Sequence, residues 1–218
     1  MRLLLLHTAA AESSVALVDT EQPEPVVATA TLPGRSASER LVLRVAELLA
    51  QQNWVLAQLD GVGVVHGPGS FTGVRVGLSA AKGLCEATGL PLVAVSRLAL
   101  VAAAAGQAEV RVVLDAGRSQ YFVGHYRAGS CLAEALLEAA AVAVDTDAVP
   151  LVTTEAAVAS AQPARLIAEP GAAALWPLVL ARLQRGEVDD ASLLDANYLR
   201  HTDVEIQARL SALGKPSA

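Results

Sequence analysis

The chain has 218 residues, of which 53% are hydrophobic and only 3% are aromatic, and its formal net charge is −6. This composition excludes an intrinsically disordered chain and predicts one large domain or two small ones with a core of Leu, Val and Ala. The arginines are scattered and no basic run is present. That pattern argues against a protein that holds nucleic acid by itself.

The sequence lacks the signals of a membrane or secreted protein. No stretch reaches the roughly 18 consecutive apolar residues of a membrane span. The apolar start, Leu3 to Leu6, is too short for the core of a signal peptide and is better explained as a buried strand. Cys85 and Cys131 lie far apart, without metal-binding spacing. We therefore expect a cytoplasmic protein with reduced thiols and no membrane association.

The first half of the chain predicts alternating strands and helices after three initial strands. The strand-like segments are rich in apolar and β-branched residues, and turn residues separate them. Ser36 or Ser38 is a candidate N-cap of the first helix, and Gly89 marks the end of the second. In chain order, the expected elements are strands at 1–8, 13–19 and 25–32, a helix at 37–53, a strand at 61–66, a helix at about 70–88, a strand at 92–95 and a helix at about 98–105.

The second half predicts a shorter version of the same order. Antiparallel strands followed by alternating strands and helices favour a mixed sheet covered by helices. The order matches a ribonuclease-H-like α/β fold, duplicated as in the actin and sugar-kinase superfamily, with an N-terminal lobe at 1–105 and a smaller C-terminal lobe at 106–218. The expected elements of the second half are a hairpin of strands at 110–115 and 120–126 around Gly117, strands at 139–144, 149–153 and 164–168, and a helix at about 172–184.

A glycine-rich turn, GPGSFTGVRVG at residues 67–77, precedes the second helix. Gly67 and Gly69 allow a tight turn, and Ser70 or Thr72 can cap the helix. Gly67, Gly69 and Ser70 could also bind an anion through exposed amides. The turn is neither a Walker loop nor a Gly-x-Gly-x-x-Gly motif. The residues favour a tight structural turn, and a phosphate cradle remains the alternative.

Two helices have apolar arcs wider than one face. In the helix after the glycine-rich turn, one stripe contains Phe71 and Leu78, and a second stripe contains the small residues Gly73 and Gly77. The earlier helix repeats the pattern, with Leu43 and small residues extending its arc. An ordinary surface helix has a single apolar face. Two explanations remain open from the pattern: the helices bury each other, or a partner protein covers the additional surface.

Residues able to carry chemistry are sparse. No two of the four histidines have the spacing that binds one metal on a helix. His7, His66 and His125 fall in or beside strands and are expected to be hydrogen-bonded core or loop residues. Asp115 ends a strand at a turn, where it could bind a metal, act as a base or, as the sequence favours, cap the turn. We therefore predict no catalytic residue, no metal site and no cofactor.

The string GPGSFTGVRVG resembles the hallmark of the TsaB family, also called YeaZ. Further similarities occur in the expected order across nearly the whole chain. They are the first strand with Thr8, the segment SSVAL at 13–17, LDA at 114–116 with Tyr121, and NYLR at 197–200.

The resemblance implies a two-lobed fold of the actin/sugar-kinase/Hsp70 superfamily. It further implies a non-catalytic scaffold or activating subunit for the formation of threonylcarbamoyladenosine in tRNA. Such a subunit pairs with the transferase TsaD, works with the ATPase TsaE, and reaches tRNA only through the complex. A nucleotide-binding or nucleotide-hydrolysing enzyme of the same superfamily is the alternative. A metalloprotease, suggested by old names in the wider family, is disfavoured because no His-x-x-x-His is present.

The resemblance also implies that the two helices of the first lobe form the partner contact, which is used for homodimers as well. This agrees with their wide apolar arcs, and we expect Gly77→Leu to abolish pairing while the monomer stays folded. The predicted contact residues are Leu41, Val45, Leu48, Phe71, Thr72, Gly73, Val74, Gly77, Leu78, Ala80, Ala81 and Leu84.

Two positions depart from the family pattern. The family usually has Asp before the Thr of the first strand, and here that residue is His7. Because such an Asp helps related ATPases to hold magnesium and phosphate, its absence makes nucleotide hydrolysis less favourable. The family often has His at the start of the first helix, where this chain has Ala37.

Overall fold

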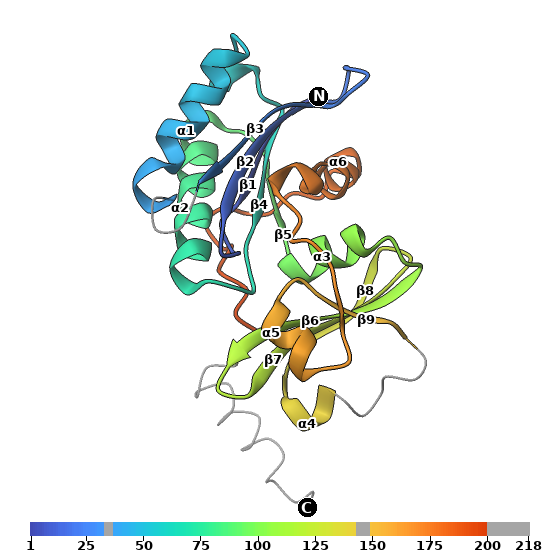
Figure 1. Cartoon of the computed structure of the whole chain (residues 1–218). Coiled ribbons are helices and arrows are strands. Elements are labelled where there is room, and N and C mark those ends of the chain that lie inside the picture. The colour runs from blue at the N-terminus through green and yellow to red at the C-terminus, as the bar shows by residue number, and fades with distance from the viewer. Residues whose placement is uncertain (33–36, 143–148, 200–218) are drawn as a thin grey trace, which may run out of the picture.

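The computed structural model describes residues 1–32, 37–142 and 149–199 of the chain (Figure 1). It contains two five-stranded mixed sheets, one in each half of the chain, with helices packed on them. Ser36, Arg200 and His201, which the sequence singled out, lie outside the described residues. Among the described helices, none combines the length and the apolar character that a membrane span requires.

The first sheet has the strand order β3-β2-β1-β4-β5. Strands β1, β2 and β3 pair antiparallel in sequence, whereas β4 and β5 add parallel to β1. The run of leucines in β1 is buried throughout because both faces of the sheet are covered. Leu4 and Leu6 point to one core cluster, and Leu3 and Leu5 to the other. The strands are β1 (Arg2–His7), β2 (Ser13–Asp19), β3 (Val26–Leu32), β4 (Gly61–Val65) and β5 (Leu92–Val95).

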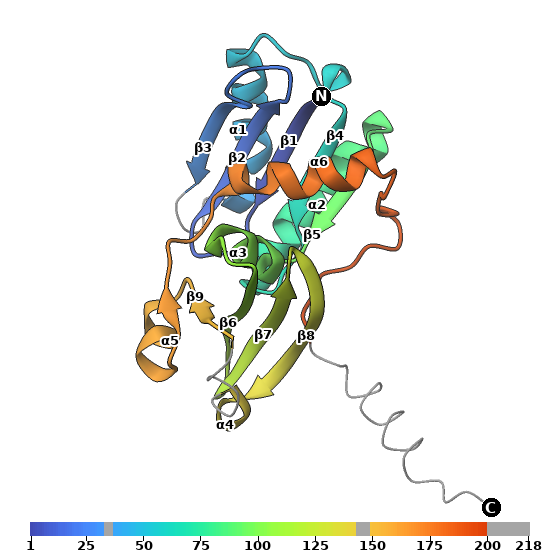
Figure 2. The ribbon, with the colours of Figure 1, turned by 90° about the vertical axis from the view of Figure 1, so that its right-hand side faces the viewer.

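Helices α1 (Ala37–Gln51) and α2 (Phe71–Thr88) cover one face of this sheet. The 3₁₀ turn η4 (Ala172–Leu175) and α6 (Trp176–Gln184) cover the other face (Figure 2). The sequence assigned this last segment to the second lobe, and that assignment is wrong. The reason is that Leu175 and α6 bury the second apolar face of the first sheet. The boundary near residue 105 itself stays a prediction.

The second sheet repeats the topology of the first. Its order is β10-β9-β6-β7-β8, with three sequential antiparallel strands and two strands added parallel beside β6. The order of three strands, helix, strand, helix and strand therefore occurs twice, and the duplicated ribonuclease-H-like fold is confirmed. The elements are β6 (Glu109–Gly117), β7 (Gln120–Arg127), β8 (Ser130–Glu138), α4 (Ala139–Val142), β9 (Leu151–Thr153), α5 (Ala156–Ala161) and β10 (Arg165–Leu166).

One element of the second half was misplaced from the sequence. The third strand was expected at 139–144, but the strand is β8, and the described part of that segment is the short helix α4. The chain turns back immediately after β7 because Ala128 and Gly129 both have positive φ angles, of 49° and 77°. Ala139 to Ala141 are strong helix formers, which explains the helix at a segment expected to be a strand.

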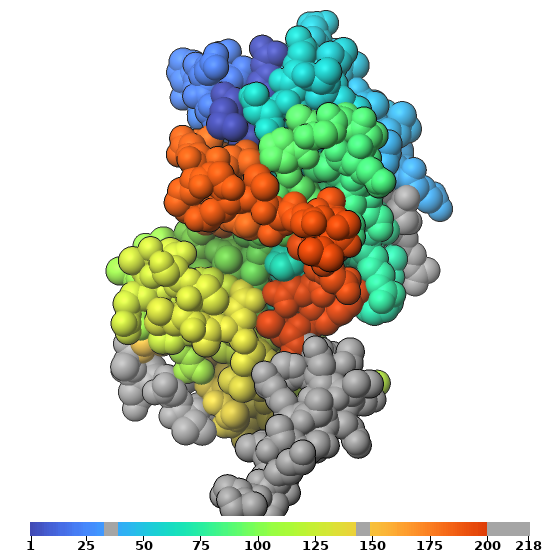
Figure 3. Space-filling view, turned by 180° about the vertical axis from the view of Figure 1, so that it is seen from behind, coloured from blue at the N-terminus to red at the C-terminus, as the bar shows by residue number. Residues whose placement is uncertain are grey.

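Helix α3 (Arg97–Ala105) lies between the two halves. Leu98 and Val101 pack in the core of the second sheet, whereas Leu100 packs in the core of the first. Residues 188–199, which we call the strap, run back from α6 along the first sheet toward β8, and Figure 3 shows their path over the surface. Both segments therefore connect the lobes.

Candidate functional site

The glycine-rich turn joins β4 to α2 as the sequence predicted. The hydroxyl of Ser70 caps α2 by accepting a hydrogen bond from the amide of Gly73 (3.2 Å). Gly89 ends the helix in the left-handed conformation, with a φ angle of 72°. Of the two candidate caps, Ser70 rather than Thr72 is therefore the N-cap.

The glycines of this motif let α2 approach the end of β1 closely. A Cβ on Gly69 would lie 2.2 Å from the carbonyl oxygen of Ala9, and one on Gly73 would lie 2.0 Å from that of Thr8. A Cβ on Gly77 would lie 2.2 Å from Oγ1 of Thr8. The hydroxyl of Thr8 in turn donates to the carbonyl oxygen of Gly73 (2.6 Å). The motif thus satisfies a packing requirement inside the chain, as the structural interpretation expected.

This packing corrects the expectation for Gly77. The residue is buried against Thr8 and does not face outward. A leucine at that position would meet the chain's own first strand, so Gly77→Leu should destabilise the monomer itself and does not test pairing alone.

Most of the predicted contact residues lie inside the chain. Those that are buried are already covered within the chain, because α1 and α2 pack on each other and on the sheet, so their part in a partner contact stays a prediction. Gly73, Ala80 and Leu84 are half-buried, and Phe71 and Thr72 are exposed. The buried ones are Leu41, Val45, Leu48, Val74, Gly77, Leu78 and Ala81.

An apolar outer face remains on α1, formed by residues that were not among the predicted contact residues. Val42 is 61% exposed and Leu43 is 54% exposed. Ala46 and Ala50 are exposed on the following turns. We call these four residues the outer face of α1. The wide apolar arc had signalled such a surface, but the sequence could not tell which stripe would face the sheet.

The start of α2 carries an exposed aromatic group held by the strap. Phe71 is 56% exposed. Its ring stacks on the ring of Tyr198, with the two centroids 5.5 Å apart. The guanidinium carbon of Arg75 lies 3.6 Å from the centroid of Phe71. These contacts bring two distant sequence motifs together, GPGSFTGVRVG and NYLR. Nothing in the sequence indicated that Tyr198 would lie beside Phe71.

A cleft of about 530 Å³ lies between the lobes. It is formed by the loop after β1, the glycine-rich turn, the start of α3 and the ends of β6 and β9. The side chains that define its charge are Glu12, Arg97, Asp115, Glu155 and Glu169.

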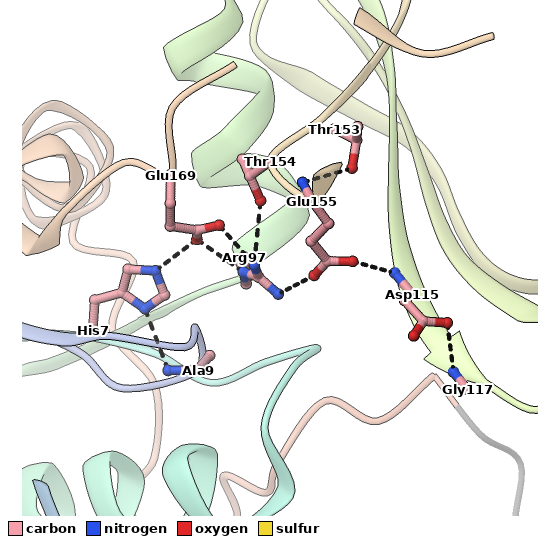
Figure 4. Close-up of polar contacts among 9 residues, drawn as sticks. All are labelled: His7, Ala9, Arg97, Asp115, Gly117, Thr153, Thr154, Glu155 and Glu169. Atoms are coloured by element: carbon pink, nitrogen blue, oxygen red, sulfur yellow. Dashed lines mark hydrogen bonds and ion pairs between the residues drawn. The ribbon is translucent and has the colours of Figure 1, made fainter. Parts of the chain in front are cut away.

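Arg97 is the only basic side chain among the described residues that line the cleft, and it already makes hydrogen bonds within the protein. Its Nε donates to Oε1 of Glu169 (2.9 Å), its Nη2 donates to Oε2 of Glu169 (2.6 Å), and its Nη1 donates to Oε1 of Glu155 (3.2 Å) (Figure 4). Burial raises the pKa of Glu169, but hydrogen bonds from Arg97 and His7 outweigh it and hold that pKa at about 2. The lining is thus dominated by carboxylates, which disfavours a phosphate ligand.

Two amides of the glycine-rich turn are already used within the chain. The amide of Ser70 donates to the carbonyl oxygen of Ala9 (2.8 Å), and the amide of Gly73 is used by the helix cap. Asp115 accepts a hydrogen bond from the amide of Gly117 (2.8 Å), so it caps its turn as the sequence favoured. Within the described ranges, no three His, Cys, Asp or Glu side chains are grouped to hold a metal.

Comparison with known proteins fits this geometry. The family model for tRNA N6-adenosine threonylcarbamoyltransferase (TsaD) matches residues 31–167. The structure of YeaZ from Pseudomonas aeruginosa superposes with a TM-score of 0.78 at 30% identity, over 91% of this chain and 99% of the other.

This chain belongs to the TsaB (YeaZ) family.

Curated sequences agree over shorter stretches. The Escherichia coli tRNA threonylcarbamoyladenosine biosynthesis protein TsaB is 32% identical over 131 residues, which are 58% of this chain and 55% of that protein. A tRNA N6-adenosine threonylcarbamoyltransferase from Paracoccus denitrificans is 48% identical over 68 residues, or 31% of this chain and 19% of the enzyme. The match therefore spans about half of the TsaB relative and a fifth of the transferase.

In this TsaB family member, the unusual His7 has a local explanation. Its ring is 1% exposed, and its Nε2 lies 3.1 Å from Oε1 of Glu169. An aspartate at this position would place a second carboxylate beside that of Glu169, and the two would repel each other. His7 and Glu169 are thus chemically matched.

Proposed function

We propose that this chain is a non-catalytic partner subunit in the formation of threonylcarbamoyladenosine in tRNA, and that it pairs with a TsaD-like transferase. The similarity to the E. coli tRNA threonylcarbamoyladenosine biosynthesis protein TsaB supports this pathway. The observation that carries the partner role is the outer face of α1, where Val42 and Leu43 are more than half exposed. Apolar side chains gathered on one helix face of a protein of this size are typical of an interaction site.

The contact would include the start of α2. Phe71 is exposed and is held in place by Tyr198 and Arg75. Aromatic and arginine side chains are enriched at the energetic centres of protein interfaces. A second copy of the chain could use the same surface in the absence of the transferase. A TsaE-like ATPase would then join the assembled pair, and tRNA would be reached only through the complex, in keeping with the net charge of −6.

A nucleotide-binding or hydrolysing enzyme is the second candidate function, and the cleft of about 530 Å³ is the observation in its favour. The charge of the cleft argues against a nucleotide there, because Arg97 is already paired with the carboxylates of Glu155 and Glu169. Calorimetric titration with ATP and Mg²⁺ separates the two proposals. Stoichiometric binding with turnover by the isolated chain would replace the partner role with an enzymatic one.

The partner role is tested by charging the exposed surface. Leu43→Glu should leave the chain folded, because Leu43 is exposed in the free chain. The variant should no longer co-purify with a TsaD-like transferase, because the contact would bury the new charge. The matched control is Val55→Glu, which changes a side chain of the same lobe that is 60% exposed but lies outside both helices. Equal co-purification of both variants would count against a contact through α1.

A further inference from the structure

A chain of polar contacts crosses the junction of the two lobes (Figure 4). His7 at the end of β1 meets Glu169, Glu169 meets Arg97 at the start of α3, and Arg97 meets Glu155 after β9. The second carboxylate oxygen of Glu155 accepts a hydrogen bond from the amide of Asp115 on β6 (2.7 Å). We call His7, Arg97, Glu155 and Glu169 the clamp. It runs without interruption from the first sheet to the second.

Burial makes the clamp costly to open. The side chain of Arg97 is 6% exposed, and that of His7 is 1% exposed. Arg97 also donates from Nη2 to the hydroxyl of Thr154 (3.2 Å) and from its amide to the carbonyl oxygen of Gly67 (2.7 Å). Separating the lobes at this point would leave a buried guanidinium without its carboxylates, which is strongly unfavourable unless water replaces both partners.

The strap adds a second set of contacts across the junction. The amide of Asn197 donates to the carbonyl oxygen of His66 in the first lobe (2.8 Å), and its side chain donates to Glu134 on β8 in the second (3.1 Å). Lys82 on α2 donates to the carbonyl oxygen of Leu194 (2.9 Å). In Figure 3 the strap lies between α2 and the strands of the second sheet. Helix α3 adds apolar contacts to both cores.

We propose that the clamp, supported by the strap, fixes the two lobes in one relative orientation through protein groups alone, so that no ligand in the cleft is needed to close it. The surface around Phe71 and Tyr198 then has a fixed position relative to the second sheet. A partner that contacts both lobes meets a preformed surface. This inference concerns the molecule itself and stands whether or not the proposed function is correct.

The distance between the lobes tests the clamp directly. Cys131 on β8 is exposed and can carry a spin label, whereas Cys85 is buried. A second label is introduced with Glu24→Cys, at an exposed position in the turn between β2 and β3. Double electron–electron resonance is measured on labelled chain diluted with unlabelled chain, so that distances between molecules do not contribute. We expect one narrow distance that ATP and Mg²⁺ leave unchanged.

Variants of the clamp should lose this single distance. Arg97→Met removes the hydrogen bonds of the guanidinium to Glu155 and Glu169. Glu155→Ala removes the contacts of that carboxylate with Arg97 and with the amide of Asp115. Arg185→Met is the matched control, because it breaks an exposed ion pair with Glu187 within the first lobe. The control should keep the narrow distance, whereas both clamp variants broaden it. If Arg97→Met does not fold, Glu155→Ala decides.

Two results would overturn the proposal. One is a broad or ATP-dependent distance in the chain that carries only the labels. The other is a folded clamp variant, shown by circular dichroism, whose distance is as narrow as that of the control.

Discussion

The inner face of α2 and the outer face of α1 are both apolar in sequence, but they have different roles. On α2, Gly73 and Gly77 lie against Thr8 so closely that no side chain fits. On α1, Val42 and Leu43 extend into solvent. Gly73 and Gly77 therefore permit close packing within the chain, whereas the large exposed residues Val42 and Leu43 mark the surface available to another protein. Four experiments test this difference between the two faces.

The largest effect is expected on the inner face. Gly77→Leu should lower the free energy of unfolding by about 3 kcal/mol or more, because the new side chain overlaps Thr8 at the end of β1. Urea denaturation measures the loss. Gly83→Ala is the control on the same helix, where nothing lies within 4 Å of the added Cβ. It should raise stability by about 0.5–1 kcal/mol, since alanine favours the helix. Equal effects at the two glycines would contradict the packing argument.

Within α1, truncation of two leucines should separate core from surface. Leu48 is 2% exposed, whereas Leu43 is 54% exposed. Leu48→Ala should cost about 3 kcal/mol because it leaves a cavity, and Leu43→Ala should change stability by less than about 0.5 kcal/mol. Thermal and urea unfolding give both values. A cost at Leu43 as large as that at Leu48 would show that the outer face is packed in the free chain.

Phe71 is exposed at the start of α2, and its truncation should have a smaller effect on stability. Phe71→Ala removes the stacking on Tyr198 and the contact with Arg75, which together are worth about 1 kcal/mol. Co-purification with a TsaD-like transferase should fall by more than this loss of stability explains. If pairing is unaffected while stability drops, the cluster serves only to hold the strap.

The smallest perturbation is chemical labelling of the thiols. Cys85, on the inner face of α2, is buried, and burial raises its pKa to about 11. Cys131 is exposed on β8. Iodoacetamide at neutral pH should therefore modify Cys131 in the native chain and Cys85 only after unfolding, because the thiolate is the reactive form. Mass spectrometry identifies the modified residue, and rapid native labelling of Cys85 would show that α2 opens readily.

Local pattern predicted much of the fold because most elements carry their own signals. The cap at Ser70, the end of α2 at Gly89 and the hairpin of β6 and β7 all follow from short-range stereochemistry. The position of β8 was predicted wrongly, because its mixture of apolar and small residues is compatible with more than one structure. Helix α5 was also missed, because its six residues give too short a period to detect.

The sequence by itself determined the order of elements in the first half, the glycine-rich connection to α2 and the family, because these depend on neighbours along the chain. The tertiary structure alone decided which stripe of each helix is buried, that residues 172–184 return to the first sheet, and that His7, Arg97, Glu155 and Glu169 meet. The physical reason is that a periodic apolar pattern specifies burial but not the surface that provides it. Contacts between residues more than fifty positions apart form only when the sheets, helices and strap pack together.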